Sequence, residues 1–450
     1  MECHLFNLTD KPFLVKPESL GNEVELVVLP NDFATLPAGG NNFTLSSAGG
    51  RSEVALEKAG LELDVERRYV NLKKSPRFRW NNVSMPEDCP WRIYRDQSSG
   101  KRVDILVLPK RALESFLSDL PDKTPLYSLC LPGTHDTVAF YGWPITQCQS
   151  ATTPLFVQLT NGIRVLDIRL AIKNRRLVAY HGQIPQRTTF RSILCDLHAF
   201  LTSPTSARET VIVSIKQEDF DTRSPKVFSG LVREEIEAGP GGRDMWFLQN
   251  RIPNLGEVRG KAIMFSRFGG DGAEWEGGLE GMGIHPTNWP DSAREGFTWM
   301  CKDVLVRTQD WYRIPSFLYI PEKTQLSVEF LLPPPADITE RVLSITYFSA
   351  SSFPLATPTI VSTGFGWPSV GLGFEGVNSR VARFLLDAIK EDVMLRAWVL
   401  MDFYDQPVGS GVVPLLIECN FRERPGDAHG AIAPDRTHKL NWSQTTKIMS

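Results

Sequence analysis

The sequence predicts an α/β protein in which an irregular (β/α)8 TIM-like barrel follows a small, β-rich, sandwich-like domain. From residue 125 onward, apolar runs of strand length alternate with stretches of helical spacing, as expected for a barrel of parallel strands. Before residue 109, short apolar runs alternate with clusters of Gly, Asn, Ser and Pro, which is typical of small sandwiches. We therefore expect two domains, residues 1–108 and residues 109–450.

The first 108 residues contain two strand candidates, 24–29 and 103–108, and turn candidates at 37–42 and 46–50. Trp80, Trp91 and Tyr94 lie close together in sequence. They either dock on lipid or sugar, or fill the core of the small domain and its contact with the barrel, and the core interpretation is favoured. The next segment, 109–122, has apolar residues at helical spacing and is expected to form a lead-in helix.

Eight barrel strands are expected, at 126–131, 163–170, 177–182, 210–216, 262–267, 304–310, 343–349 and 396–403. Helices are expected at 151–161, 189–202, 224–238 and 377–391. Only six residues separate Leu170 from Leu177, whereas a parallel crossover needs about a dozen or more. The barrel is therefore expected to be irregular there, with a hairpin-like turn at 173–176 that folds His181 back beside Arg169.

The composition is that of an ordinary globular protein, with 42% hydrophobic and 22% charged residues. A net charge of −3 gives no global indication of nucleic-acid binding. We see no signal peptide and no apolar run approaching the ~18 residues of a transmembrane helix. The seven cysteines are scattered, which favours free thiols in a reducing compartment. We expect a cytoplasmic or peripheral membrane protein, with secretion by another route left open.

Polar residues occur where the apolar strands are expected to end. They are His135, Asp136, Asp167, Arg169, His181, Lys216, Arg267, Asp310, Tyr312 and Asp402. Because the carboxyl ends of barrel strands meet at one rim, we expect these side chains to surround one site. Its cations indicate an anionic ligand, most simply a phosphate. Two histidines with carboxylate neighbours indicate an acid and a base, so the set predicts phosphoryl chemistry on a neutral polyol.

A metal ion is the competing chemistry for this site. Asp136 and Asp167 offer two carboxylates, but calcium needs several oxygen ligands close together. Arg169 is expected between these carboxylates and the phosphate, where its fixed charge repels a cation. No HxxxH pattern or CxxC pair indicates zinc. We therefore expect neither a metal ion nor another cofactor.

At these residues the chain resembles the X domain of phosphatidylinositol-specific phospholipase C, particularly the metal-independent bacterial type and its fungal relatives. The resemblance covers about residues 109–420. Its motifs follow the family order: LPGTHD at 131–136, DIR at 167–169, HG at 181–182, ETVIVSIK at 209–216, WPD at 289–291, QDWY at 309–312 and MDF at 401–403. Several short motifs at compatible spacing make the resemblance specific.

The resemblance implies a catalytic role for six residues. His135, oriented by Asp402, would deprotonate the inositol 2-hydroxyl, and Arg169 would stabilise charge on the phosphate oxygens. His181, supported by Asp136, would protonate the departing diacylglycerol oxygen. Asp167 would hold Arg169 or the acid in place. The products would be diacylglycerol and inositol 1,2-cyclic phosphate.

The substrate implied is phosphatidylinositol, or a glycosylated relative, at a membrane surface. Lys216, Arg267 and Asp310 would bind the inositol hydroxyls, Tyr312 would lie against the ring, and Trp289 would line the same pocket. Aromatic residues at 140, 141, 143 and 156 either dip into the bilayer or pack on the accessory domain. The accessory domain is expected to bind membrane, glycan or protein.

Two other functions stay open on the sequence alone. One is a metal-dependent glycerophosphodiester phosphodiesterase on a similar barrel, although the position of Arg169 argues against it. The other is a non-catalytic protein that binds an inositol lipid or a glycan and keeps the pocket without turnover. The intact pair of His135 and His181 argues against the second alternative.

Overall fold

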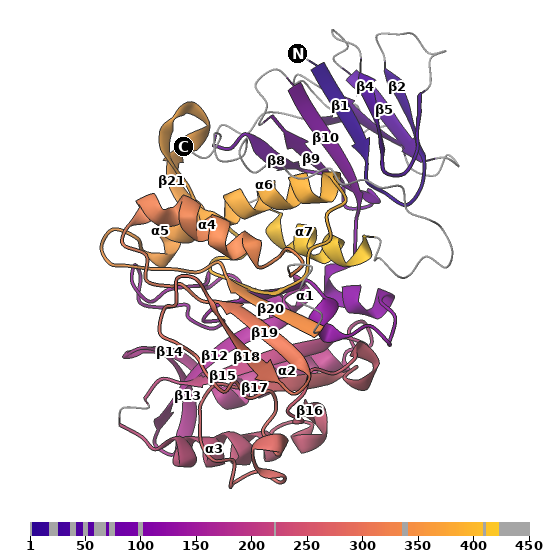
Figure 1. Ribbon diagram of the computed structural model, residues 1–450. Coiled ribbons are helices and arrows are strands. Elements are labelled where there is room, and N and C mark those ends of the chain that lie inside the picture. The colour runs from indigo at the N-terminus through magenta and orange to yellow at the C-terminus, as the bar shows by residue number, and fades with distance from the viewer. Residues whose placement is uncertain are drawn as a thin grey trace.

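The computed structural model has a β-rich N-terminal region followed by one large, curled α/β sheet (Figure 1). It describes residues 2–17, 26–36, 42–47, 53–57, 69–71, 77–97, 102–219, 222–334, 341–407 and 411–422. The predicted fold class, an irregular barrel-type α/β fold preceded by a β-rich region, is confirmed. Within these segments, every helix is too short or too polar to cross a membrane.

The N-terminal region forms two five-stranded sheets. One has the order β4 (Asp32–Leu36), β1 (Glu2–Asn7), β10 (Arg102–Pro109), β9 (Trp91–Asp96), β8 (Trp80–Val83). The other has the order β3 (Leu26–Val28), β2 (Phe13–Pro17), β5 (Asn42–Ser47), β6 (Glu53–Glu57), β7 (Tyr69–Asn71). Buried Leu5, Phe13, Val15 and Ile93 belong to one core shared by both sheets, as in a sandwich. Residues 24–25 and the turn candidates at 37–41 and 48–50 lie outside the described residues.

Three aromatic residues of this region are buried, so the core interpretation is confirmed. Trp91 lies in the sandwich core, whereas Trp80 and Tyr94 belong to the main core shared with the barrel. The indole Nε1 of Trp80 donates to Ser379 Oγ at 3.1 Å. The hydroxyl of Tyr94 donates to the carbonyl of Gly411 at 3.4 Å. These contacts join the N-terminal sheets to the C-terminal part of the barrel.

The large sheet has eight parallel strands among its described residues, in the order β16-β17-β15-β12-β11-β23-β20-β19. Their bounds are β11 (Leu131–Thr134), β12 (Val165–Lys173), β15 (Thr210–Gln217), β16 (Trp246–Phe247), β17 (Lys261–Ser266), β19 (Val304–Gln309), β20 (Arg341–Tyr347) and β23 (Trp398–Met401). An antiparallel strand, β18 (Phe297–Cys301), pairs with β19. Along the described strands, the outer edges β16 and β18 do not pair with each other, so the sheet curls without closing.

The expected irregularity after Leu170 is confirmed. Strand β13 (Arg176–His181) pairs antiparallel with β12, and β14 (Ile184–Thr189) extends this hairpin. The segment 177–182 is therefore not one of the barrel strands, and the short β16 takes the eighth parallel position. The expected strand at 126–131 is also wrong. Residues Leu126–Ser128 form a 3-10 turn (η3) because the carbonyl of Pro125 accepts from Ser128 N at 3.0 Å and Oγ at 2.8 Å.

Four helices match the expected ones: α1 (Leu155–Thr160), α2 (Phe190–Thr202), α3 (Pro225–Glu237) and α6 (Val377–Lys390). Three others were not predicted: α4 (Ile320–Glu329), α5 (Pro358–Thr363) and α7 (Val412–Glu418). Two of these are short, and α4 buries polar Lys323 and Thr324 on its inner face, which obscures the apolar periodicity. Between α5 and α6, β21 (Gly364–Trp367) and β22 (Leu372–Glu375) form a projecting hairpin (Figure 1).

The segment expected as a lead-in α-helix is instead a 3-10 helix, η2 (Leu113–Asp119), with non-helical backbone angles at Ser115. The carbonyl of Glu114 accepts from Arg164 Nη2 at 2.6 Å. Arg164 is fully buried and forms an ion pair with Glu209 at 2.8 Å, and Ser118 N donates to Glu209 at 2.8 Å. The buried ion pair therefore fixes this segment against the barrel and overrides its helical spacing.

Glu209→Gln is expected to lower the free energy of unfolding by about 3–5 kcal/mol, because it leaves the guanidinium of Arg164 buried without a counter-charge. Denaturant-induced unfolding measures this loss. The matched control is Glu237→Gln, which breaks the exposed ion pair with Arg233 on α3 and is expected to cost less than about 1 kcal/mol. Equal losses in the two variants would show that the buried pair is not the anchor.

Candidate active site

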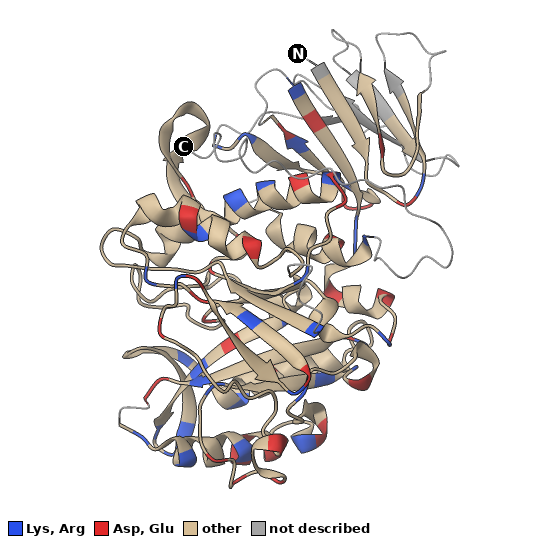
Figure 2. Ribbon diagram, in the orientation of Figure 1, with Lys and Arg blue, Asp and Glu red and all other residues tan. Residues whose placement is uncertain are grey.

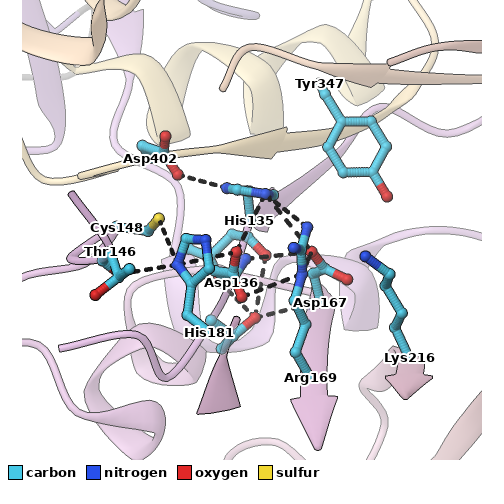
Figure 3. A network of polar contacts seen from close by, with 12 residues as sticks. His135, Asp136, Thr146, Cys148, Asp167, Arg169, His181, Lys216, Tyr347 and Asp402 are labelled. Atoms are coloured by element: carbon cyan, nitrogen blue, oxygen red, sulfur yellow. Dashed lines mark hydrogen bonds and ion pairs between the residues drawn. The ribbon is translucent and has the colours of Figure 1, made fainter. Parts of the chain in front are cut away.

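Charged and aromatic side chains converge at the carboxyl ends of the parallel strands (Figure 3). They come from β11, β12, β15, β17, β20 and β23, and from the end of the β13–β14 hairpin. We call them the active-site cluster: His135, Asp136, Asp167, Arg169, His181, Lys216, Glu218, Arg267, Tyr347 and Asp402. The carboxyl end of a barrel sheet is where catalytic groups are found in enzymes of this architecture.

The backbone around β11 sets the position of the first two residues of this cluster. A Cβ on Gly133 would lie 2.5 Å from Val165 O and 2.6 Å from Val399 O, so only glycine lets β11 fit between β12 and β23. Just beyond the strand, Asp136 has a φ of 42°, in the left-handed region that few non-glycine residues adopt. Its N–H donates to Asp167 Oδ2 at 3.3 Å, which holds the strained turn over the barrel end.

His135 is held from both sides of its ring. Nδ1 lies 2.8 Å from Asp402 Oδ1, and Nε2 lies 2.8 Å from Arg169 Nη2. Because a guanidinium only donates hydrogen bonds, Nε2 is the acceptor and Nδ1 carries the proton that Asp402 accepts. Burial lowers the pKa of His135 well below its usual value, and the charge of Arg169 lowers it further. The ring is therefore a neutral imidazole whose basic lone pair is on Nε2, where it accepts from Arg169.

His181 faces His135 across the cluster, with 6.5 Å between the ring centroids. Its Nδ1 donates to the carbonyl of Thr146 at 2.9 Å and lies 3.5 Å from Asp136 Oδ2. The thiol of Cys148 is 3.7 Å from the same nitrogen. The carbonyl accepts the hydrogen bond from Nδ1, which leaves Nε2 as the ring nitrogen available to a ligand.

Arg169 links the two carboxyl groups at the centre of the cluster. Its Nε lies 3.1 Å from Asp136 Oδ1 and 3.2 Å from Asp167 Oδ2, and its Nη1 lies 3.5 Å from Glu218 Oε1. Burial raises the pKa of Asp136 to about 6, although Arg169 opposes the rise. Asp167 is equally buried, but Arg169 and Arg267 overcome that effect and hold its pKa well below its usual value.

Cationic and aromatic side chains form one wall beside this centre. Arg267 lies 3.4 Å from Asp167 Oδ1 and donates to Tyr347 Oη at 2.9 Å. Its guanidinium stacks on Trp289 at 3.8 Å, and the indole donates to Asp310 Oδ2 at 2.9 Å. Lys216 lies next to Arg169 in the register of β15 and β12, and the charge of Arg169 lowers the pKa of Lys216. The wall offers donors and a ring face to a polar, anionic ligand.

Three groups of side chains in the described chain have ligand atoms close enough to hold a metal ion: His135/Cys148/Asp402, Asp136/Cys148/His181 and His135/Asp136/Asp167. In the third group both carboxylates already bond Arg169 at 3.1 and 3.2 Å. The guanidinium therefore supplies the positive charge that a divalent cation would bring to this position.

Comparisons with known proteins give a consistent set of relatives, although no protein-family model matches the chain. A 1-phosphatidylinositol phosphodiesterase of Listeria monocytogenes is 32% identical over 163 residues, which cover 34% of this chain and 48% of that protein. A 1-phosphatidylinositol phosphodiesterase of Staphylococcus aureus is 24% identical over 320 residues, which cover 68% of this chain and 94% of that protein. The chain is a homologue of the bacterial phosphatidylinositol-specific phospholipases C.

Solved structures of two phosphatidylinositol-specific phospholipases C share the fold of this homologue. The Staphylococcus aureus structure matches with a TM-score of 0.54 at 20% identity, over 68% of this chain and 97% of that protein. The Listeria monocytogenes structure matches with a TM-score of 0.50 at 24% identity, over 69% of this chain and 99% of that protein. Both comparisons support the open barrel described above.

The structure brings together ten of the eleven residues that the sequence singled out. These are His135, Asp136, Asp167, Arg169, His181, Lys216, Arg267, Trp289, Asp310 and Asp402, linked by the contacts given above. Tyr312 is the exception, because its hydroxyl donates to Asp291 and its ring lies 5.3 Å from the guanidinium of Arg313. Residues 310–316 are irregular and not an extension of β19, so the alternation of side chains along a strand does not place Tyr312 in the cluster.

Several residues of this phospholipase C homologue were missed in the sequence. Glu218 lies two residues after Lys216, directly after β15, so its strand-end position could have indicated it. Tyr347 ends β20, two residues before the expected end of the strand at 349, so it was overlooked. Cys148 and the carbonyl of Thr146 belong to an irregular loop, where periodicity gives no indication. The amide of Gln149 donates to the carbonyls of His135 at 2.8 Å and Met401 at 2.9 Å, a bracing contact that no motif predicts.

Arg169→Gln is expected to raise the pKa of Asp136 above its value of about 6, because the nearest cation that favours the carboxylate is removed. Carbon-13 NMR titration of the carboxyl resonance, assigned with Asp136→Asn, measures this change. Arg267→Gln is the control, since Arg267 contacts Asp167 and not Asp136, and the pKa of Asp136 should stay closer to 6. An unchanged titration in Arg169→Gln would contradict the central placement of the guanidinium.

Proposed function

We propose that the chain is a phosphatidylinositol-specific phospholipase C, a phosphorus–oxygen lyase that acts on phosphatidylinositol or its glycosylated relatives. The observation that carries the proposal is the neutral ring of His135, held between Asp402 and Arg169 and facing His181. An internal attack on a phosphodiester uses a base for the attacking hydroxyl, an acid for the leaving oxygen and a cation for the charge on the phosphate, and His135, His181 and Arg169 supply these groups in one cluster. The activity of the bacterial relatives points the same way.

In the first step His135 acts as the base. Nε2 takes the proton of the inositol 2-hydroxyl while Asp402 accepts the hydrogen bond from Nδ1. Burial raises the pKa of Asp402 well above its usual value, and the positive charge that develops on the ring favours its carboxylate form. The freed oxygen attacks the neighbouring phosphorus. Arg169, held by Asp167, turns its Nη2 donor from His135 to the non-bridging oxygens, where charge accumulates.

In the same displacement the bond between phosphorus and the glycerol oxygen breaks. His181 donates its Nε2 proton to that oxygen, and Asp136 stabilises the cationic ring before transfer. The products are diacylglycerol and inositol 1,2-cyclic phosphate, so one proton is taken and one is given in each turnover. No covalent enzyme intermediate is needed, and the two histidines end in reversed protonation states that exchange with water.

Binding of the inositol ring is assigned to the wall next to Arg169. Lys216, Arg267 and Asp310 carry donors and an acceptor suited to hydroxyl groups, and Trp289 gives them a rigid aromatic backing. Tyr347 replaces Tyr312 as the aromatic group at this wall, because its ring lies 6.0 Å from that of His135. Residues 109–450 would form the catalytic domain, and residues 1–108 a separate accessory domain.

Exposed apolar side chains flank the cluster and supply the contact with a membrane. Trp143 is 73% exposed and Ile145 is 50% exposed, in the same loop whose Thr146 carbonyl holds His181. Ile184 continues the patch from the β13–β14 hairpin at 40% exposure. Such exposure favours docking on a lipid surface, rather than on the accessory domain, for Trp143, and Tyr141 and Phe156 are partly exposed as well. Phe140 instead packs against the main core.

His135→Ala and His181→Ala are each expected to reduce release of inositol 1,2-cyclic phosphate by roughly a hundred-fold to ten-thousand-fold, the range for losing a general base or acid. Phosphorus NMR of products from phosphatidylinositol measures this and separates cyclic from linear phosphate. His198→Ala, on the outer helix α2, is the control and should leave the rate unchanged.

The same assay is run with and without a chelator. Turnover is expected to persist with the chelator, because Arg169 occupies the position between the carboxylates. Turnover that disappears and returns with calcium or magnesium would favour a metal-dependent glycerophosphodiesterase instead. Substrate binding without any product in the parent protein would favour a non-catalytic lipid-binding role.

Trp143→Ala is expected to lower turnover on phosphatidylinositol vesicles several-fold while leaving turnover of a monomeric short-chain substrate unchanged, because only the former requires docking. Met300→Ala provides the control, since Met300 is 48% exposed and pairs with Leu305 near the start of β19, at the end of the barrel opposite the cluster. If Trp143→Ala slows both substrates equally, the loop serves the chemistry and not the membrane contact.

A further inference from the structure

A second basic cavity lies outside the active-site cluster, where the N-terminal region meets the β21–β22 hairpin. Its volume is about 250 Å³. It is lined by four arginines, Arg77, Arg79, Arg380 and Arg383, together with Phe78, Pro321, Pro368, Ser369, Gly373, Phe374 and Glu375. We call it the arginine pocket. It shares no lining residue with the active-site cluster.

Arginines outnumber carboxylates among the described residues that line the arginine pocket. Glu375 is the one carboxylate among these described residues, and it lies 3.7 Å from Arg383 Nη1. Among the described residues, Arg79 and Arg380 have no carboxylate within ion-pair distance, although Arg380 Nε donates to the carbonyl of Glu375 at 3.0 Å. Several guanidiniums facing one cavity repel each other, and an anion with several oxygen atoms relieves that repulsion.

Main-chain contacts fix the arginine pocket in place. Arg77 Nη2 donates to the carbonyls of Thr363 and Gly364, each at 3.1 Å, and Arg77 O accepts from Ser369 N at 3.1 Å. The N-terminal region is thereby tied to both ends of β21. The pocket is therefore built jointly by the two parts of the chain, and its donors are held before any ligand arrives.

Two lining residues place the arginine pocket at the end of the barrel that carries the active-site cluster. Pro321 is in the first turn of α4 and Arg380 is in the first turn of α6. Helices that follow parallel strands begin at the end where those strands finish, and α4 follows β19 in this way. Figure 2 shows basic positions along α6, which runs beside the N-terminal sheets.

The hairpin next to the arginine pocket exposes apolar side chains. Trp367 is 58% exposed, and Val370 and Leu372 are each 65% exposed. They alternate along the hairpin with Pro368, Ser369 and Gly373, which line the pocket. Exposed apolar groups immediately beside clustered arginines are the pattern that binds an anionic lipid surface.

We propose that the arginine pocket binds the phosphate of an anionic lipid headgroup, while Trp367, Val370 and Leu372 enter the adjoining lipid. Guanidiniums suit a phosphate because they donate paired, charge-assisted hydrogen bonds. This site is separate from the one that would cleave the substrate, and it gives the N-terminal region a role in membrane binding that does not depend on the proposed chemistry.

Vesicle co-sedimentation of the full chain at about 0.15 M salt tests the proposal, with phosphatidylcholine vesicles alone or containing phosphatidic acid. The parent protein is expected to bind the anionic vesicles more tightly. The double variant Arg79→Gln/Arg380→Gln should lose roughly thirty-fold in affinity, because each basic residue near an anionic surface contributes roughly five-fold. Arg79→Gln alone, at an exposed position, should lose part of this and guards against misfolding of the double variant.

The control is Arg233→Gln/Arg243→Gln, which removes the same charge from two partly exposed positions on α3 and the adjacent turn. It should retain the affinity of the parent. An equal loss in this control would mean that net charge, and not the arginine pocket, drives binding and would overturn the proposal. Calorimetry with glycerol 3-phosphate gives a second arm: tight binding that the pocket variant abolishes, with vesicle binding unchanged, would identify a soluble phosphate ester and also overturn the lipid assignment.

Discussion

The guanidinium of Arg169 is the interaction on which the candidate active site depends. It contacts Asp136, Asp167 and the Nε2 atom of His135 within 3.2 Å. Both carboxyl groups are buried, and buried carboxylates are unfavourable without a compensating charge. A single fixed cation on β12 therefore allows two carboxyl groups and a histidine to lie together. The tautomer of His135 is also decided by this contact, since a guanidinium cannot accept a hydrogen bond.

The pKa values of Asp136 and Asp167 differ, although both carboxyl groups contact Arg169. Asp167 has Arg169 and Arg267 beside it, so its pKa is held low. Asp136 is closer to the two histidines and to less positive charge, so burial dominates and its pKa is about 6. Asp167 thus stays ionised and holds Arg169, whereas the pKa of Asp136 depends also on the charge of His181.

Much of this arrangement could be predicted from the sequence because polar residues mark the ends of the apolar strand segments. Asp167 and Arg169 interrupt the apolar run of β12 just beyond the level at which β11 ends, and the apolar runs of β11 and β23 stop at His135 and Asp402. Parallel strands then bring these ends together without further information. The antiparallel hairpin carrying His181 was predictable from loop length alone. Tyr312 was misplaced because it follows its strand by three residues, where the chain is irregular and the period of two no longer applies.

Other features could not be predicted because they depend on contacts between distant segments. The 3-10 helix η2 is set by the buried pair of Arg164 and Glu209, about 50 to 90 residues further along the chain. The arginine pocket needs Arg77 and Arg380, which are 303 positions apart in the printed numbering. Neither residue stands in a motif, so the charge imbalance is visible only after folding.

His135 and His181 are held by different parts of the fold, because only His181 lies on the β13–β14 hairpin. His135 follows a strand that is clamped on both sides by neighbours in the sheet. His181 sits at the tip of a hairpin that pairs with the sheet through β12, and the carbonyl of Thr146 and the carboxyl of Glu218 hold this tip. A shift of the loop that carries Thr146 would therefore move the proton donor without moving the base. Substitutions in this peripheral loop would thus change proton donation by His181 while the position of His135 stays the same.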